Sequence, residues 1–373
     1  MAMGVLAWRG NPLTLPLAVG FPALWSFASS RMVAALVSAG YFLAASRGLP
    51  QGVANFYGAH GALGFALWIA ASLAFTGIQT ALWTKGRGWR KPVLYGVAAI
   101  AMSIPPFGIV GWANPITAAG VLFPSWGWFG LAATAVLMLA TATRLWPLAA
   151  IVVCGAWGLA VVNWTPALPP PGWAGIETLF RGSNGQYAGY EQQRETIELV
   201  LSAAAHGAKM IVLPESAAGV WTPTVERLWT DALRGKDVVV NAGAAVVGRA
   251  GYDNVMMEIT AQGAHVLYHE RMPVPLSMWQ PWLDWIGQDG GARANFFANP
   301  IVESGGRRVA PVICYEQLLV WPILQSMLHA PDIIVASGND WWTQGTDIVA
   351  IQRASTEAWA RLFGIPLVVA FNT

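Results

Sequence analysis

Long hydrophobic runs separated by short polar breaks dominate the first 164 residues. Each run is near the ~20 apolar residues that an α-helix needs to cross a bilayer. The runs cover 13–29, 32–46, 62–83, 93–111, 120–143 and 145–164. The first two are short and interrupted by glycine or proline, so the count allows for one further span. This pattern predicts a polytopic α-helical membrane domain of about six to seven spans over residues 1–164.

A different pattern follows, in which short apolar strands alternate with amphipathic helices. Strands are expected at 175–180, 208–213, 237–243, 254–260, 264–270, 308–314, 332–336 and 366–371. Helices are expected at 189–206, 222–234, 316–328 and 346–363. The alternation predicts a layered α/β domain over residues 175–373. The proline-rich segment 165–174 is typical of a stiff linker between the two domains.

Charge separates the same two regions. Residues 1–176 contain eight Lys or Arg and no acidic residue, whereas the rest of the chain holds all 19 acidic residues and has a net charge of −6. Basic residues without interspersed acids, in a chain with only 11% charged residues, favour a membrane protein over a nucleic-acid-binding one. Four basic residues within 85–91 mark a cytoplasmic loop. Counting spans from there places the α/β domain on the periplasmic side of an inner membrane.

Polar residues with useful chemistry follow three of the expected strands. Glu215 directly follows the segment Met210–Pro214, and Cys314 directly follows Val309–Ile313. Asn339-Asp340 lies shortly after Ile333–Val335. The carboxyl ends of strands are where sites form in α/β sheets. A cysteine at a strand-to-helix turn meets backbone N–H groups that lower its thiol pKa and hold an oxyanion. No His/Cys spacing suits a metal and no Gly-rich loop suits phosphate, so neither a metal nor an organic cofactor is implied.

The residues at these strand ends resemble a known family. Leu213–Ser216, Ile313–Glu316 and Asn339–Trp342, in this order and spacing, resemble the carbon–nitrogen hydrolase (nitrilase) superfamily. The resemblance implies an αββα sandwich for the second domain. The preceding apolar region resembles the apolipoprotein N-acyltransferase branch. Within that branch, Ile104–Pro115 and Arg271–Pro275 resemble proteins of conjugal plasmid transfer.

The resemblance also implies roles for individual residues. Cys314 would be the nucleophile that forms a thioester, and Glu215 the general base. The backbone N–H of Tyr315 would hold the oxyanion, and Glu316 would be a supporting carboxylate. From the residues alone, a surface acid at position 215 and an ordinary first-turn helix glutamate at position 316 stay open. Of the two cysteines, we expect Cys314 rather than Cys154 to be the more reactive.

One departure from the family concerns a lysine that binds the oxyanion. The family carries this lysine in a Tyr-x-Lys-Arg element, where the present sequence has Tyr268-His269-Glu270-Arg271. Glu270 therefore stands in the position of the lysine. Arg271 is a candidate replacement, but neighbouring residues of a strand face opposite sides. The chain also ends at Thr373, where the family continues, which suggests a C-terminal truncation.

Three interpretations of function remain open. The first is a membrane-bound amidase or acyltransferase that acts through a Cys thioester and serves conjugal plasmid transfer. The second is a lipoprotein N-acyltransferase that uses phospholipid as acyl donor. The third is a catalytically dead nitrilase-like domain that binds a component of the conjugation apparatus. The expected partners are therefore membrane lipids, a lipid-like acyl donor or a conjugation-apparatus protein, but not nucleic acid.

Three tryptophans, Trp279, Trp282 and Trp285, recur at a spacing of three residues. A helix over this segment would gather them on one face. They belong either to the core of the domain or to a lid that dips into the membrane interface, where tryptophan is favoured. In the second interpretation, the face controls the entry of an acyl chain to Cys314.

Overall fold

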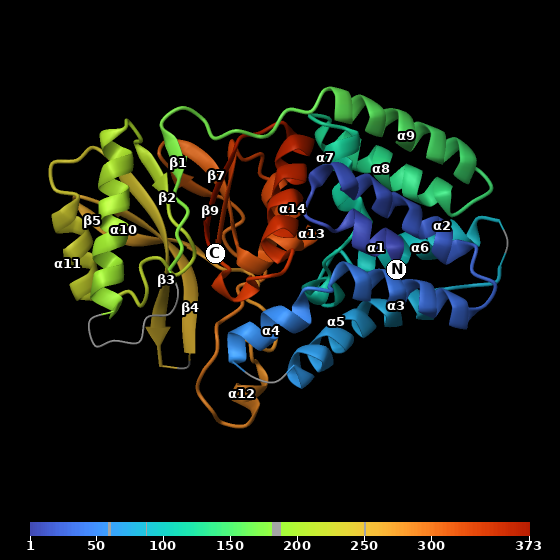
Figure 1. Ribbon diagram of the computed structural model, residues 1–373, viewed down its shortest axis with the longest axis horizontal. Coiled ribbons are helices and arrows are strands. Elements are labelled where there is room, and N and C mark those ends of the chain that lie inside the picture. The colour runs from blue at the N-terminus through green and yellow to red at the C-terminus, as the bar shows by residue number, and fades with distance from the viewer. Residues whose placement is uncertain (59–60, 87, 181–187, 250) are drawn as a thin grey trace. The chain divides into compact units, whose positions relative to one another are not determined.

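The computed structural model describes residues 1–373 except 59–60, 87, 181–187 and 250 (Figure 1). Arg87, one of the basic residues of the 85–91 loop, therefore lies outside the described residues. The described chain forms two compact units. The helical unit comprises Met1–Ala167, Leu318–Trp321 and Trp342–Ile365. The α/β unit comprises Leu168–Gln317, Pro322–Trp341 and Pro366–Thr373.

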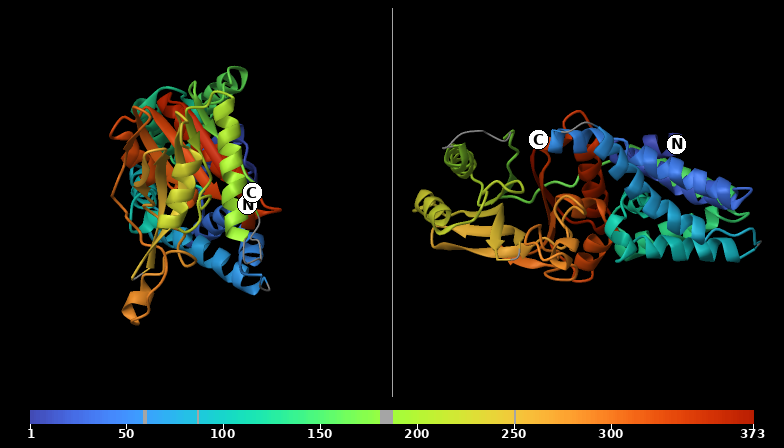
Figure 2. Two further views of the ribbon diagram at one scale, coloured as in Figure 1. Left: turned by 90° about the vertical axis from the view of Figure 1, so that its left-hand side faces the viewer. Right: turned by 90° about the horizontal axis from the view of Figure 1, so that it is seen from below.

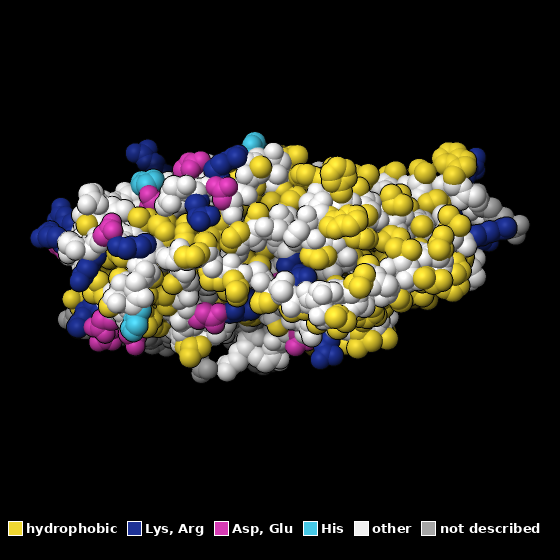
Figure 3. Space-filling model, turned by 90° about the horizontal axis from the view of Figure 1, so that it is seen from above, with side chains coloured by type: hydrophobic (Ala, Val, Ile, Leu, Met, Phe, Trp, Pro, Cys, Tyr) yellow, Lys and Arg dark blue, Asp and Glu magenta, His cyan; other side chains and the backbone are white. Residues whose placement is uncertain are grey.

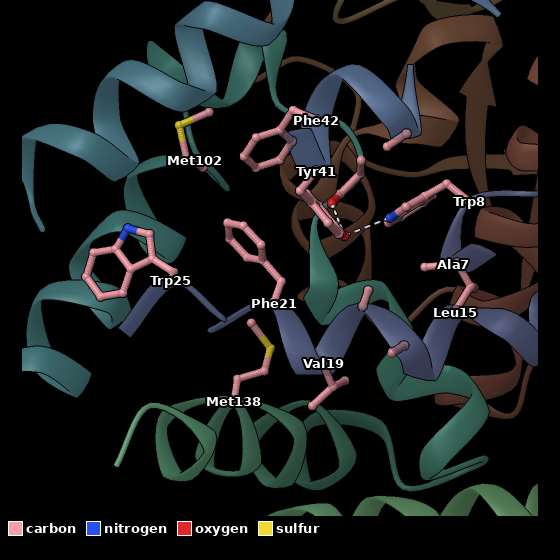
Figure 4. Packing of buried hydrophobic residues seen from close by; sticks show 14 of the residues in the cluster. Ala7, Trp8, Leu15, Val19, Phe21, Trp25, Tyr41, Phe42, Met102 and Met138 are labelled. Carbon is pink, nitrogen blue, oxygen red and sulfur yellow. Dashed lines mark hydrogen bonds between the residues drawn. The ribbon is translucent and has the colours of Figure 1, made fainter. Parts of the chain in front are cut away.

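The helical unit is built from short helices around an aromatic core. Its α-helices are α1 (Ala2–Ala7), α2 (Phe21–Ser26), α3 (Arg31–Ala45), α4 (Leu49–Tyr57), α5 (Ala62–Ala81), α6 (Arg90–Ala101), α7 (Ala119–Leu122), α8 (Gly127–Thr141), α9 (Trp146–Val162) and α14 (Ile348–Phe363). Its 3₁₀ turns are η1 (Pro12–Gly20), η2 (Phe107–Val110), η3 (Pro115–Ala118) and η5 (Trp341–Thr343), the last of which begins one residue earlier, in the α/β unit. In the core, the ring of Phe21 stacks on Tyr41 at 4.5 Å (Figure 4). The Tyr41 hydroxyl accepts from Trp8 Nε1 and donates to the Ala113 carbonyl, so its polar atom is satisfied inside the core.

Helices α7 and α14 approach each other at a glycine. A Cβ on Gly120 would lie 1.6 Å from the carbonyl oxygen of Ala358. Since no side chain fits at that distance, this contact requires glycine.

The prediction of a polytopic membrane domain with six to seven spans is wrong. Within the described residues, α5 alone is both long and apolar enough to cross a bilayer, and α3 with α4 would be a second span if that pair, bent by 49°, is counted as one. Two of the long apolar runs are divided where helices end. Residues 123–126 separate α7 from α8 within the run 120–143, and residues 103–106 separate α6 from η2 within the run 93–111. A hydropathy pattern measures the composition of a run but not these breaks, which leave pieces too short to span.

The α/β unit contains two sheets. The first has the order β1 (Trp173–Gly175), β2 (Met210–Val212), β3 (Val239–Gly248), β4 (Gly251–Thr260), β5 (Gly263–His269). Strands β1–β3 are parallel, and β3–β5 form antiparallel pairs. The second has the order β6 (Val302–Ser304), β7 (Arg307–Ile313), β8 (Ile333–Asn339), β9 (Leu367–Asn372), with β7–β9 parallel. Seven of the eight expected strands are present, the one expected at 175–180 shares only Gly175 with β1, and β6 was not expected.

Two apolar layers hold this unit together (Figures 1 and 2). Helices α10 (Ala188–Ala205) and α11 (Pro223–Ala232) cover one face of the first sheet through Val200 and Trp229. The other face packs on the second sheet through Val212 and Met256 against Val309 and Val335. Strand β2 is buried along its whole length because it is covered on both faces.

The remaining helical elements of the chain are η4 (Cys314–Leu318), α13 (Val320–Met327) and α12 (Trp282–Trp285). On the face seen in Figure 3, hydrophobic side chains cover most of the helical unit, and charged side chains gather over the α/β unit. This agrees with the uneven distribution of charge along the sequence.

Candidate active site

Cys314 occupies a strained turn at the carboxyl end of β7. It is the first residue of η4, and its backbone φ is 45°, in the left-handed region that non-glycine residues rarely adopt. Such backbone strain is characteristic of functional sites, where the surrounding structure holds it. The side chain is 4% exposed, and its sulfur forms no disulfide with Cys154, the other described cysteine. The turn therefore presents a single buried thiol at the end of the strand.

Glu215 lies beside this thiol, shortly after the end of β2. Its carboxylate is 5% exposed, which rules out the interpretation as a surface acid. It accepts hydrogen bonds from the Cys314 thiol, from Asn254 Nδ2 at 2.6 Å and from the Asn339 backbone N–H at 3.0 Å. A buried carboxylate that accepts from a thiol has the geometry of a general base and its nucleophile.

The position of Glu215 depends on a glycine in the neighbouring strand. Gly243 of β3 passes so close that a Cβ there would lie 2.4 Å from the Glu215 Cα and 2.7 Å from the Pro214 carbonyl oxygen. The Gly243 N–H donates to that carbonyl at 3.2 Å. Glycine at this position thus lets β3 support the segment that carries the carboxylate.

The electrostatics of this pair favour a neutral thiol. Burial raises the pKa of Glu215 to about 6, although hydrogen bonds from Asn254, Cys314 and Asn339 oppose that rise. Burial, followed by the negative charges of Glu215, Asp340 and Glu270, raises the pKa of the Cys314 thiol well above its ordinary value. The thiol is therefore reactive only when Glu215 takes its proton. This differs from the expectation of a thiolate held by backbone N–H groups, and Cys154, not Cys314, is the exposed thiol.

Glu316 is a buried hub behind the nucleophile turn. Its carboxylate is fully buried and accepts from the Tyr268 hydroxyl at 2.8 and 2.9 Å and from the backbone N–H groups of Ile313 at 2.8 Å and Arg271 at 2.6 Å. Burial raises its pKa, and the charge of Arg271 and these hydrogen bonds oppose the rise. These contacts join the end of β7 to the end of β5. Glu316 therefore positions the turn and is not an ordinary helix-start glutamate.

Arg271 is directed toward this hub. Its guanidinium is fully buried, lies 3.8 Å from Glu316 Oε1, and donates to the Tyr268 hydroxyl at 2.9 Å and to Gln325 Oε1 at 3.1 Å. The partners of the Arg271 guanidinium are therefore Glu316, Tyr268 and Gln325 rather than Glu215 or Cys314. They reflect the alternation of neighbouring residues at the end of β5.

Glu270 faces the opposite way, toward Glu215. It is fully buried, and its Oε2 accepts from Asn254 Nδ2 at 2.8 Å, the same amide group that donates to Glu215. Burial, followed by the negative charges of Glu215 and Glu316, raises the pKa of Glu270 well above its ordinary value. The position that carries a lysine in the family is thus held here by a carboxyl group without a cation partner among the described residues.

One site residue, Asn254, was missed from the sequence, and Asp340 was noted after a strand but given no role. Asn254 lies in the middle of β4 and joins the two carboxylates. Asp340, 1% exposed, acts with its charge on the Cys314 thiol. An asparagine within a strand, buried beside Val255 and Met256, was the available signal for Asn254, because asparagine is depleted in strands unless its amide is used. The backbone N–H of Tyr315 directly follows the nucleophile, where its role was expected.

The tryptophans of the expected lid are not gathered on one helix. Helix α12 contains only Trp282–Trp285, so Trp279 precedes it. Trp279 packs edge-on against Phe296 at 5.5 Å, whereas Trp285 is 82% exposed. The lid and its membrane contact stay a prediction, and Trp285 is the member of the set that is placed to make such a contact. Among the residues that the structure describes, no group of three or more His, Cys, Asp or Glu could hold a metal ion.

Comparison with known proteins identifies the family of this chain. A carbon–nitrogen hydrolase family model matches residues 43–361. Because the match covers most of residues 1–164, that region does not form a membrane domain separate from the hydrolase domain. Among solved structures, a cysteine-to-alanine mutant of the Nesterenkonia AN1 amidase of the nitrilase superfamily is similar at TM-score 0.40 and 14% identity, over 55% of this chain and 79% of that chain.

Two curated relatives are similar over the whole of this chain. The probable conjugal transfer protein TraB of Sinorhizobium fredii is 54% identical over 100% of this chain and 96% of the relative. The conjugal transfer protein TraB of Agrobacterium fabrum is 54% identical over 100% of this chain and 91% of the relative. Both findings confirm the resemblance drawn from the motifs at Glu215 and Cys314. The chain belongs to the carbon–nitrogen hydrolase family.

Proposed function

We propose that this protein is a nitrilase-like amidase or acyltransferase that forms a thioester on Cys314 and serves conjugal plasmid transfer. The observation that carries the proposal is the buried pair of Glu215 and Cys314. The pKa of Glu215, raised by burial to about 6, suits a base that is ionised near neutral pH yet returns a proton readily.

The chemistry follows from this pair. Cys314 sulfur attacks the substrate carbonyl as Glu215 takes the thiol proton, and the carbonyl π electrons move to oxygen. The tetrahedral species then collapses, the carbon–nitrogen or carbon–oxygen bond of the donor breaks, and Glu215 returns its proton to the leaving group. Water or an amine attacks the thioester in the second half, while Glu215 takes its proton and gives it to the departing sulfur.

Service in conjugation rests on the relatives. Two proteins 54% identical to this chain are named as conjugal transfer proteins. A lipoprotein N-acyltransferase that uses phospholipid is the second enzymatic hypothesis, and it differs from the first in fixing both the acyl donor, a phospholipid, and the acceptor, an amine. A catalytically dead binding domain is the second class of function, and Glu270 in the position of the family lysine is the observation that favours it.

An exposed apolar surface on the helical unit supports the lipid-linked hypotheses. The helical unit exposes large apolar side chains, among them Phe129 and Val162, which are 82% and 83% exposed. Soluble monomers rarely expose large contiguous apolar patches. We infer that this surface lies against lipid at the inner membrane. Flotation with phospholipid vesicles tests it: the Phe129→Ser, Val162→Ser double variant should float less than the parent protein.

Intact-protein mass spectrometry tests the enzymatic reading. Purified protein is incubated with a small primary amide in one arm and with phosphatidylethanolamine vesicles in the other. The proposal expects an acyl adduct on Cys314 whose mass identifies the donor, with none on Cys314→Ala and little on Glu215→Gln. An adduct from the vesicles alone would favour lipoprotein-type acyl transfer.

Plasmid transfer separates the enzyme from the binding domain. A strain that lacks the gene is complemented with the parent protein or with Cys314→Ala, and transfer frequency is measured. The proposal expects no rescue by Cys314→Ala at equal protein level. Full rescue, together with no adduct in either arm, would establish the binding-only reading.

A further inference from the structure

Glu270 presents one oxygen atom that has no hydrogen-bond partner. The residue follows β5, and its backbone N–H donates to the Asn254 carbonyl at 2.8 Å, which fixes the main chain. Its Oε2 accepts from Asn254 Nδ2 at 2.8 Å. Its Oε1 is buried and makes no hydrogen bond within the described part of the chain. A buried polar atom is rarely left unpaired, so this oxygen requires an explanation.

The surroundings of Glu270 are negative from several elements. Glu215 faces it from the end of β2 and Glu316 from η4, and the Glu270 charge in turn acts on Cys314 and on Tyr252 of β4. On its own segment, the guanidinium of Arg271 is engaged by Glu316, Tyr268 and Gln325. A buried carboxylate without a cation is costly, and such a group takes up a proton instead.

The hydrogen bonds indicate which of the two neighbouring carboxyl groups holds the proton. Glu215 accepts from three donors: Asn254, Asn339 and Cys314. The carboxyl group of Glu270 accepts from Asn254 alone among the described residues. Donors stabilise the ionised form, so Glu215 is the carboxylate and Glu270 the acid. A pair of carboxyl groups whose environments separate them in this way divides base and acid roles.

We propose that Glu270, as a neutral carboxylic acid, donates a hydrogen bond from Oε1 to the oxyanion that forms when Cys314 attacks the substrate carbonyl. This inference rests on the proposed thioester chemistry and gives the family's lysine position a new donor. The Glu270 proton stays on Oε1 throughout, and the Cys314 proton is the one that moves to Glu215 and on to the leaving group. Asn254 holds both carboxyl groups at the reacting atoms through its single amide nitrogen.

The assignment makes a distinct prediction for pH dependence. Activity rises as Glu215 ionises and falls at alkaline pH as Glu270 loses its proton, because an ionised Glu270 repels the oxyanion. A glutamine at position 270 keeps a neutral N–H donor and cannot ionise. It should therefore retain the acid limb and lose the alkaline limb.

Acylation of Cys314 across pH, in the full-length protein and with the donor that acylates the parent protein, tests the proposal. Glu270→Gln should stay within about tenfold of the parent protein and lack its alkaline fall, whereas Glu270→Ala should fall by about 10²–10³-fold, as expected for a lost oxyanion donor. Glu303→Gln, an exposed glutamate of β6, is the matched control and should leave rate and profile unchanged. Circular dichroism verifies that each variant is folded.

Infrared spectroscopy of the resting protein gives a second readout. The carbonyl band of a protonated carboxylic acid should be present near neutral pH in the parent protein and lost in Glu270→Gln. A parent protein that acylates while Glu270→Ala matches it in rate, or a Glu270→Gln variant that keeps the alkaline fall, would overturn the donor role alone. If the parent protein forms no adduct with any donor, the thioester function fails and this inference fails with it.

Discussion

Glu215 and Glu270 accept hydrogen bonds from the same amide group, 2.6 and 2.8 Å from Nδ2 of Asn254. Two buried carboxyl groups that share one donor cannot both carry a charge at low cost. The arrangement therefore links the protonation of the site to the stability of the fold, as well as to any reaction at Cys314.

Glu270→Gln should change how stability depends on pH. The folded-state pKa of Glu270 is raised, so the folded form keeps a proton that the unfolded chain loses above a pH of about 4.3. The free energy of unfolding of the parent protein should then fall with rising pH, by up to about 1.4 kcal/mol per pH unit from this group, until pH passes the folded pKa. Glu270→Gln removes this pH-dependent contribution. The free energy of unfolding of the variant, relative to that of the parent protein, should therefore rise with pH.

Urea unfolding followed by circular dichroism between pH 6 and pH 9 measures this difference. Glu215 contributes the same kind of slope only up to its pKa of about 6, and Glu316 contributes equally to both proteins. Parallel curves for the parent protein and Glu270→Gln over this window would show that Glu270 is ionised in the folded state.

Glu316→Gln should be strongly destabilising. The change removes the counterion of the fully buried Arg271, and an uncompensated buried charge costs about 3–5 kcal/mol. Glu198→Gln is the control, because its pair with Arg194 at 3.6 Å is exposed and is worth at most about 1 kcal/mol. Urea midpoints report both, and equal midpoints for the two variants would contradict the role of Glu316 as a hub.

Gly243→Ala should displace Glu215. A Cβ 2.4 Å from the Glu215 Cα forces backbone movement, with a cost of about 1–3 kcal/mol and a lower rate of Cys314 acylation. Gly248→Ala is the matched control in the same strand, because its Cβ would lie 3.5 Å from the nearest atom, Arg293 Nη2. Thermal unfolding and the adduct assay should separate the two, and a Gly243→Ala protein with parental acylation would refute the packing argument.

The two thiols should differ in reactivity in the order opposite to that expected from the sequence. Cys154 is exposed, while Cys314 is buried with a raised pKa, and the thiolate is the reactive form. A maleimide should modify Cys154 rapidly and Cys314 slowly, as read by peptide mass spectrometry, and Cys154→Ser should leave only the slow reaction. Rapid modification of Cys314 would contradict the description of its thiol as both buried and neutral.

Trp285 should account for any lipid contact of the α12 segment. It is 82% exposed, whereas Trp279 is packed on Phe296. In nanodiscs with brominated lipid, Trp285→Phe should lose quenchable fluorescence and Trp279→Phe should lose little. If neither variant differs from the parent protein, the segment does not touch the membrane.

The motifs of the site were predictable from the sequence because each one ends a strand. Strands of apolar residues followed by Glu215, Cys314 and Asn339 are local patterns, and the chemistry of a buried acid beside a thiol follows from their residue types. The family follows from the same motifs. Asn254 was not predictable, because its importance lies in joining residues 39 and 16 positions away in the chain.

The helical unit shows where local pattern fails. Hydropathy located the apolar segments, but the ends of the helices depend on local breaks, such as residues 103–106 and 123–126, which divide two of the runs. Whether a helix spans a membrane depends on its length and on which residues pack around it. The composition of an apolar run gives neither of these properties.

The sequence by itself determined the strand pattern, the family and the identity of the reactive side chains. Only the tertiary structure decided their protonation, because a pKa depends on burial and on charges brought close by folding. Glu270 in the sequence is simply a glutamate in the position of a lysine. In the fold it is a buried group that shares Asn254 with Glu215 and leaves one oxygen unpaired, and that environment makes it an acid.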